Sequence, residues 1–344
     1  MVSCIFCFAS VDRGDYNRVR VSNGLWGRPI AYQEEPVPFA DGTFGDPLHK
    51  SADGGAVYAK DDGTGYYYAS NSEEGNPDDP TGGVWVLETD IEHNVVDYYQ
   101  ILGGTVDNCA GGRTPWGTWV SCEEEDGYGY CWQTDPANKD QTGPTKSEKT
   151  VVAPYGSNWE AFAWDDEDYP PRGYVTHDAE PEDAPDAYGA LVRFTPDEKA
   201  LKCYHGATKA EKWCTLNSGT HDYLKLNKYP HGSNCGTIEW VATPEEANSG
   251  DYRNNEGIDI TDRILRFVAK KERQLFTIDL EKQTYCQTST LEGPAQEPDN
   301  IRMLGDILYI CTDGRTPNGV FGYDYKGYFP LFPECVYLSR KVSQ

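Results

Sequence analysis

The sequence predicts an all-β protein built from many short strands. It contains 24 tyrosines, nine tryptophans and 35 glycines, and stretches with helical periodicity are few. Aromatic residues favour strands, and glycine favours the tight turns that join them. From Ala56 onward, short strand-like runs alternate with turn signals. Their spacing is typical of a β-propeller or a large β-sandwich, although no strict repeat is visible.

The strand-like runs can be followed along the chain. The first two flank the glycine-containing loop Asp61–Gly65 and predict a hairpin. Residues 126–158 and 205–236 are rich in loop-forming residues and predict long loops. The predicted strands are 56–58, 66–70, 83–88, 95–102, 118–122, 161–164, 173–176, 190–194, 237–242, 258–260, 264–269, 274–279, 307–311 and 319–323.

The domain organisation predicted from this pattern is simple. Residues 1–45 look irregular, and no charge run or low-complexity linker divides the remainder. We therefore expect an irregular N-terminal segment, residues 1–45, followed by a single β domain, residues 46–344.

The charge of the chain limits its partners. Fifty-six acidic residues against 30 basic ones give a formal charge of -26. Such a surface repels nucleic acid and anionic membranes and attracts cations, although acidity also serves solubility alone. No run approaches the roughly 20 apolar residues of a membrane span. We expect a monomer that binds neither nucleic acid nor membrane.

Eleven cysteines leave the cellular location open. Cys4 and Cys7 form a C-x-x-C pair, but no second pair stands at zinc spacing. Cys122 and Cys131 are close enough in sequence to link a hairpin, which a secreted protein would allow. We expect a secreted, periplasmic or extracellular protein, although the apolar segment Val2–Val11 lacks the basic residues of a signal peptide.

One segment carries the strongest chemical signal. The string Asn108-Cys-Ala-Gly-Gly-Arg-Thr-Pro-Trp-Gly-Thr-Trp119 places a thiol on a glycine-rich turn, and Cys122-Glu-Glu-Glu125 follows one strand later. A thiolate favours a transition metal, whereas carboxylates favour calcium or oxidised iron. A buried cysteine on a structural turn would give the same string.

Further acidic residues stand beside strand-like runs. In a propeller, the inner strands point the same ends toward one axial channel, so carboxylates from different blades can meet there. Each residue taken singly could equally be a turn or surface acid. The candidates are Glu73, Glu123, Glu124, Glu160, Glu256, Asp299 and Asp313.

Arginines provide candidate catalytic groups. Arg113 lies beside the cysteine turn, Arg253 lies near Glu256, and Arg315 follows Asp313-Gly314. A guanidinium could grip phosphate with two hydrogen bonds, although a surface ion pair is the commoner arrangement. The sequence contains no nucleophile elbow, phosphate-binding P-loop or dinucleotide fingerprint.

Taken together, these residues resemble the PhoX-type calcium-dependent alkaline phosphatase family. The most specific part is Asn108 to Glu124, and the resemblance runs from roughly Asp46 to Glu334. Its supporting parts are Asp53-Gly54, Ser70-Asn-Ser-Glu73, Glu160, Glu256-Gly-Ile-Asp259, Pro298-Asp-Asn300 and Cys311-Thr-Asp-Gly314.

The resemblance implies a six-bladed propeller with long loop insertions that hydrolyses small phosphate monoesters. It implies a cluster of Fe³⁺ and Ca²⁺ in the axial channel and metal-ion catalysis. Cys109 would be an iron ligand. Glu73, Glu123, Glu124, Glu160, Glu256 and Asp299 would bind iron or calcium, and Arg113 and Arg253 would act on the phosphate.

Two departures from the family pattern bear on activity. The family usually carries an arginine two residues before the Glu-Gly glutamate, where this chain has Asn254; Arg253 is one place away. The chain also ends at Gln344, earlier than the family pattern, so the last blade could be incomplete. Two alternatives therefore stand beside the phosphatase: an inactive calcium-binding propeller and a lactonase-like propeller hydrolase.

Overall fold

The computed structural model describes residues 28–178, 191–230, 232–247, 252–291, 295–312, 319–324 and 327–332. The Cys4–Cys7 pair, the Asp313–Gly314 turn and Arg315 lie outside these residues. Within the described ranges, no helix is long and apolar enough to span a bilayer.

The described residues form five groups of four antiparallel strands, here called blades. Each blade is built in chain order. The first comprises β3 (Ala52–Ala59), β4 (Gly65–Ser72), β5 (Gly82–Asp90) and β6 (Val95–Thr105). The second comprises β7 (Asn108–Arg113), β8 (Trp119–Glu123), β9 (Cys131–Thr134) and β10 (Glu148–Lys149). The third comprises β11 (Trp159–Asp165), β12 (Arg172–His177), β13 (Leu191–Pro196) and β14 (Gly219–Lys228).

The fourth blade comprises β16 (Asn255–Thr261), β17 (Ile264–Ala269), β18 (Gln274–Asp279) and β19 (Thr284–Ser289). The fifth comprises β20 (Pro298–Leu304), β21 (Ile307–Thr312), β22 (Gly319–Tyr323) and β23 (Tyr328–Phe332). A separate two-stranded sheet is formed by β1 (Pro36–Pro38) and β2 (Phe44–Pro47). The all-β propeller class predicted from the sequence is confirmed, and the predicted total of six blades stays a prediction.

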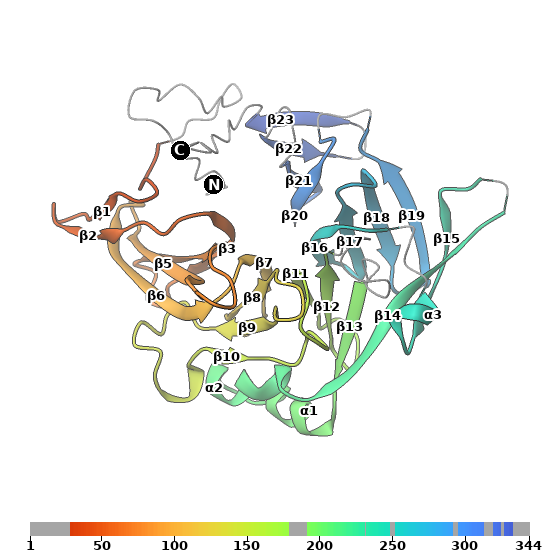
Figure 1. Cartoon of the computed structure of the whole chain (residues 1–344), viewed down its shortest axis with the longest axis horizontal. Helices are drawn as coiled ribbons and strands as arrows, with labels where there is room; N and C mark the ends of the chain where they lie inside the picture. The colour runs from red at the N-terminus through yellow and green to blue at the C-terminus, as the bar shows by residue number, and fades with distance from the viewer. Residues whose placement is uncertain are drawn as a thin grey trace.

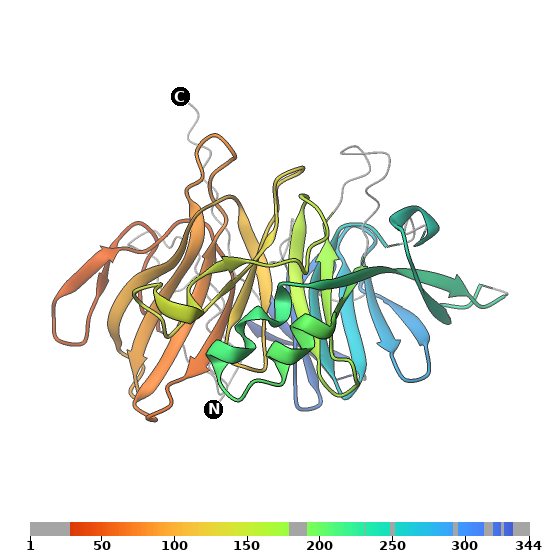
Figure 2. The same cartoon turned by 90° about the horizontal axis from the view of Figure 1, so that it is seen from below.

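The blades are arranged around a common centre. Strands β3, β7, β11, β16 and β20 lie innermost, and the later strands of each blade lie progressively outward (Figure 1). Viewed from the edge, the strands stand side by side across a flat ring (Figure 2). The first residues of all five inner strands therefore converge near the axis.

Apolar side chains hold neighbouring blades together. One buried cluster joins the first and second blades, a second joins the second and third, and others join the third to the fourth and the fourth to the fifth. Within the fourth blade, the rings of Phe267 and Phe276 stack with centroids 4.6 Å apart. Because the second, third and fourth blades bury both faces against neighbouring blades, the hydrophobic effect stabilises the ring rather than any single sheet.

The third and fourth blades are also linked at their outer edges. Strand β15 (Cys235–Val241) pairs with both β14 and β19, so the two blades share one nine-stranded sheet. A disulfide between Cys235 and Cys286 ties β15 to β19, and a second joins Cys203 to Cys214. The short helices are α1 (Glu198–Tyr204), α2 (Lys209–Lys212) and α3 (Pro244–Ala247), with 3-10 turns at Gly143–Thr145 and Trp213–Leu216.

The structure contains strands where the sequence predicted loops. Strands β9 and β10 lie within the predicted loop 126–158, and β14 lies within the predicted loop 205–236. These are outer strands of their blades, with short or polar sequences, so they lack the apolar alternation on which the prediction relied. The apolar strands β17, β18 and β22 agree with their predicted bounds to within a residue, whereas the inner strands β7 and β20 were not predicted.

Candidate metal centre

Each of the five inner strands carries a β-bulge at the same place. The pairing with the second strand shifts by one residue, so that two inner-strand residues oppose one partner residue. The shifts fall between Ala52 and Gly55, Asn108 and Gly111, Trp159 and Phe162, Asn255 and Ile258, and Pro298 and Ile301. The five blades thus share a structural repeat at the axial ends of their inner strands.

The first residue inside each bulge has a metal-ligating side chain. These residues are Asp53, Cys109, Glu160, Glu256 and Asp299. They form two groups, Asp53–Cys109–Glu160 and Glu160–Glu256–Asp299, and within each group the ligand atoms lie within 4.8 Å of one another. Because Glu160 belongs to both groups, the five bulges make one continuous cluster.

A second position repeats where the second strand of a blade ends. In four blades, the residue after that strand donates its backbone N–H to the carbonyl two residues before the bulge residue. These bonds run from Glu73 to Ser51 (2.9 Å), Glu124 to Asp107 (2.8 Å), Asp178 to Asn158 (2.9 Å) and Lys270 to Asn254 (2.9 Å). The corresponding position of the fifth blade, residue 313, lies outside the described residues.

Side chains at this second position extend the cluster. Glu73 and Glu124 join Cys109 in a third group whose ligand atoms also lie within 4.8 Å of one another. Cys109 is therefore shared by two groups, as Glu160 is. Asp178 adds a further carboxylate, which accepts a 2.8 Å hydrogen bond from Asn254 Nδ2 and lies near enough to Glu124 to raise its pKa.

Neighbouring side chains fix the backbone at Cys109, which lies in strand β7 and not on the glycine-rich turn that the sequence predicted. Asn71 Nδ2 donates to the carbonyl oxygens of Cys109 (2.8 Å) and Ala110 (2.7 Å), and Asn71 Oδ1 accepts a 2.9 Å hydrogen bond from Trp119 Nε1. Gly54 follows the bulge residue of the first blade, and a Cβ there would lie 2.5 Å from the Ala110 backbone. The inner strands of the first two blades can approach this closely only with glycine at that position.

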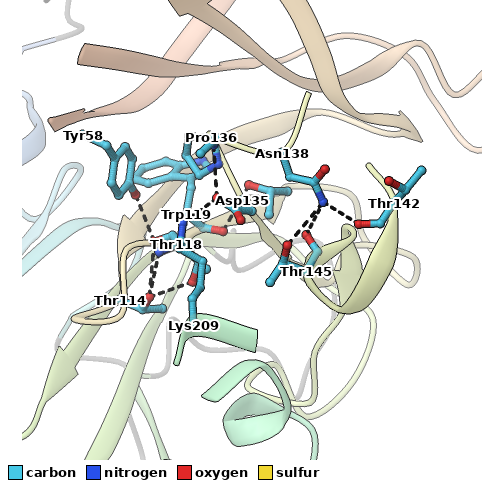
Figure 3. A network of polar contacts seen from close by, with 12 residues as sticks. Tyr58, Thr114, Thr118, Trp119, Asp135, Pro136, Asn138, Thr142, Thr145 and Lys209 are labelled. Carbon is cyan, nitrogen blue, oxygen red and sulfur yellow. Dashed lines mark hydrogen bonds and ion pairs between the residues drawn. The ribbon is translucent and has the colours of Figure 1, made fainter. Parts of the chain in front are cut away.

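The turn that joins β7 to β8 is held by its own polar network. Tyr58 Oη donates to the carbonyl of Thr118 (2.9 Å), and the hydroxyls of Thr114 and Thr118 lie 2.7 Å apart. Figure 3 shows Tyr58, Thr114, Thr118 and Trp119 close together at this turn. Protein hydrogen bonds alone hold the turn, so its Gly-Arg-Thr-Pro-Trp-Gly sequence serves the fold as well as the centre.

Burial and mutual repulsion perturb the groups of the cluster. Glu160 is fully buried, and neither of its carboxylate oxygens has a hydrogen-bond partner within the described part of the chain. Burial first, and then the charges of neighbouring carboxylates, raises the pKa of Glu160 and of Glu256. Burial likewise raises the pKa of the Cys109 thiol, and the pKa of Glu124 rises to about 9. An unpaired buried carboxylate is costly unless a cation or a proton neutralises it, so this donor set fits a metal.

The metal-free protein is expected to lose stability as the pH rises from 7 to 9. A carboxyl group whose pKa is raised on folding keeps a proton that the unfolded chain has already released. Stability therefore falls with rising pH, by about 1.4 kcal/mol per pH unit for each proton kept. Two buried histidines, His49 and His177, have pKa values lowered to about 4 and give the opposite slope at lower pH. Above pH 7 they are neutral in both states.

Urea unfolding at pH 7, 8 and 9 in the presence of a chelator measures this slope. The same series with saturating Ca²⁺ is expected to show a smaller slope, because bound cations replace the protons. A metal-free protein whose unfolding free energy is constant or rises over this interval contradicts the arrangement described.

The structure does not bring three of the predicted site residues into the described ligand groups. Glu123 accepts hydrogen bonds from Val106 N (3.0 Å), Tyr130 N (2.9 Å) and Trp132 Nε1 (2.9 Å). It is the last residue of β8, and successive strand residues face opposite sides, so Glu124 and not Glu123 reaches the axis.

The two predicted arginines also have other contacts. The Arg113 guanidinium lies 4.7 Å from the centre of the Tyr58 ring, and Arg253 forms an ion pair of 2.8 Å with Glu272. Within the described residues, neither belongs to a ligand group. Both guanidinium groups therefore make their contacts outside the ligand groups.

Sequence reasoning missed two ligand candidates of the centre, Asp53 and Asp178, and the lysine that pairs with its carboxylates, Lys270. Asp53 was included only as part of a motif, and neither Asp178 nor Lys270 was predicted to belong to the site. The signal that could have found Asp178 and Lys270 is positional, because each directly follows the second strand of its blade. Without the strand bounds, that position cannot be located.

The fold and these ligand groups define a β-propeller with clustered metal-ligating side chains at its axis. Residues 70–175 match the model of the family "Alkaline phosphatase PhoX", and this segment contains Cys109, Glu124 and Glu160. The resemblance seen in the sequence is therefore confirmed over that segment. No curated protein matches the chain significantly.

Solved structures with a similar course of the chain share little sequence with it. The PQQ-bound aldose sugar dehydrogenase of Streptomyces coelicolor is 14% identical, with a TM-score of 0.46, over 83% of this chain and 85% of that one. The periplasmic gluconolactonase PpgL of Pseudomonas aeruginosa is 12% identical, with a TM-score of 0.43, over 85% and 74%. The β-propeller domain of the Trilobed protease of Pyrococcus furiosus is 8% identical, with a TM-score of 0.37, over 82% and 86%.

Proposed function

We propose that this protein is a metal-dependent hydrolase of phosphate monoesters, with iron and calcium held at the axis of the propeller. The observation that carries the proposal is the set of three ligand groups joined through Cys109 and Glu160. Four of the seven residues in these groups, Glu73, Cys109, Glu124 and Glu160, lie in the segment that matches the PhoX family model, which favours a phosphatase over other metal-binding propellers.

The donor atoms support two kinds of metal. Cys109 supplies a soft sulfur to two groups, and that sulfur favours iron there. The other members of those two groups, Asp53, Glu73, Glu124 and Glu160, supply carboxylate oxygens, which are the donors that Ca²⁺ prefers. The unpaired oxygens of the buried Glu160 are the clearest sign that the centre is built for cations.

Bound metal ions would supply positive charge that neutralises phosphate oxygens and activates the attacking oxygen. The protein's own contribution is to hold the ligands in place before substrate arrives. The five bulges fix the inner ligands on strands, and the hydrogen bonds of Asn71 fix the backbone at Cys109. Loaded with cations, the centre would also offset the acidic surface that repels a phosphate ester.

One observation favours a second candidate, a cation-binding propeller without phosphatase activity. Arg113 and Arg253 are engaged with Tyr58 and Glu272, so neither is positioned to grip a phosphate. In that case metal would bind and stabilise the ring, but no ester would be hydrolysed.

Metal analysis and a phosphatase assay on the same purified sample separate these candidates. We expect iron and calcium in the protein and hydrolysis of p-nitrophenyl phosphate that stops after treatment with a chelator and returns with Ca²⁺. Bound metal with no turnover on several phosphate esters would favour the second candidate. A protein that takes up neither metal would contradict both.

The two disulfides support a proposal about location. Cys203–Cys214 and Cys235–Cys286 persist most readily in an oxidising compartment. We therefore infer a secreted or periplasm-like setting, which detection of the intact disulfides by peptide mapping of the native protein would test.

A further inference from the structure

The second repeated position of the blades carries a charge reversal. The residue after the second strand is Glu73 in the first blade, Glu124 in the second and Asp178 in the third, but it is Lys270 in the fourth. All four make the same backbone hydrogen bond, so Lys270 occupies the place of a carboxylate and not a neighbouring one.

The side chains of Glu73 and Lys270 also contact the next blade in the same way. Glu73 of the first blade meets Cys109, which is the bulge residue of the second blade. Lys270 of the fourth blade meets Asp299, which is the bulge residue of the fifth, with 2.9 Å between Nζ and Oδ2. Lys270 Nζ also lies 3.3 Å from Glu256 Oε1, in its own blade. The ammonium group therefore stands between two carboxylates of the Glu160–Glu256–Asp299 group.

We propose that Lys270 is a built-in cation of the centre, which takes the place of a metal ion between the fourth and fifth blades. This inference rests on the metal centre of the proposed function. It makes the ring asymmetric: mobile cations bind at the two groups that share Cys109, whereas the chain's own ammonium neutralises Glu256 and Asp299. Lys270 thus limits how many metal ions the centre holds.

The physical reason is competition for the same oxygens. A metal ion entering the Glu160–Glu256–Asp299 group must displace the ammonium or bind beside a like charge. At the separations seen here, a neighbouring positive charge weakens the binding of a cation even with strong screening. Loss of that charge should therefore tighten cation binding at this group by about tenfold or more.

Calcium binding to Lys270 variants tests the proposal. The protein is stripped with a chelator and then titrated with Ca²⁺ alone, by calorimetry and by equilibrium dialysis, without substrate. We expect Lys270→Glu, which restores the carboxylate of the other blades, to bind one more Ca²⁺ per chain or to tighten the weakest class of sites at least about tenfold. Lys270→Met is expected to change binding in the same direction by less.

Two control variants make the result specific. Lys270→Arg keeps the charge, and Lys271→Glu makes the same charge change at the exposed neighbouring residue. Both are expected to bind Ca²⁺ as the wild type does. The proposal is overturned if Lys270→Glu and Lys271→Glu bind alike. If Lys270→Glu does not fold, as judged by circular dichroism, then Lys270→Met decides in the same way, and wild-type binding by that variant overturns the proposal.

The outcome is distinguishable from failure of the proposed function. An absence of phosphatase activity leaves the Ca²⁺ titrations interpretable, because they involve no ester. Conversely, if the protein is an active phosphatase but its Ca²⁺ binding is unchanged in the Lys270 variants, the proposed function stands and only the role of Lys270 is rejected.

Discussion

Replacement of Cys109 by serine is expected to remove iron from the protein and to lower phosphatase activity by more than about 100-fold. Cys109 is the one residue shared by the Asp53–Cys109–Glu160 and Glu73–Cys109–Glu124 groups, so its loss affects both at once. A serine hydroxyl stays protonated at neutral pH and cannot replace a thiolate ligand, and even residues that merely orient metal ligands are typically worth 10- to 100-fold, roughly.

Iron content by elemental analysis and hydrolysis of p-nitrophenyl phosphate are the two measurements. Cys131→Ser is the matched control, because Cys131 is likewise a buried cysteine and belongs to none of the groups formed by the described residues. Wild-type iron content in Cys109→Ser would exclude the sulfur as a ligand. Full activity with the iron lost would show that the reaction does not depend on it.

Replacement of Glu160 by glutamine is expected to act in opposite directions on the metal-free and metal-loaded proteins. Glutamine keeps the shape of the side chain but cannot ionise. At pH 8 the metal-free variant does not bury a carboxyl group among other carboxylates. We therefore expect its free energy of unfolding in urea to be at least that of the metal-free wild type. With metal, the wild type should gain about 2.7 kcal/mol when free metal stands at 100 times its dissociation constant, and the variant should gain far less.

The comparison needs four unfolding curves, with and without Ca²⁺ for each protein. Glu239→Gln removes an exposed carboxylate and is expected to leave all the curves unchanged within about 0.5 kcal/mol. If Ca²⁺ stabilises Glu160→Gln as much as the wild type, then the Glu160 carboxylate contributes no free energy to Ca²⁺ binding.

The sequence predicted the apolar middle strands of the blades better than the others, and the innermost strands β7 and β20 were not predicted. The hydrophobic strands β17, β18 and β22 were found almost to the residue, because they are apolar and bounded by turns. The outer strands β9, β10 and β14 were taken for loops. An outer strand of a blade has a polar edge and little area to bury, so its conformation depends on the strand beside it and not on its own sequence.

The candidate site was also only partly predictable. The motif around Cys109 and the Glu-Gly step at Glu256 pointed to their residues directly, because a cysteine beside two glycines is chemically distinctive, although Cys109 lies in strand β7 and not on a turn. Glu123 and Glu124 are adjacent in sequence and equally acidic, and only the strand pairing shows that Glu123 turns to Val106, Tyr130 and Trp132. Lys270 carried no signal at all, since its significance lies in replacing an acid at an equivalent position.

The sequence by itself determined the class of the fold and the kind of chemistry. Its alternation of short apolar runs with turns leaves no other way to bury the side chains than in packed sheets, and its thiol and carboxylates fix which cations could bind. The tertiary structure decided which of the many acids meet. Residues as far apart as Asp53 and Asp299 become part of one cluster because five inner strands bulge at the same place around a common axis. That bulge is a property of the strand pairing, and strand pairing is set by contacts between residues distant in the chain.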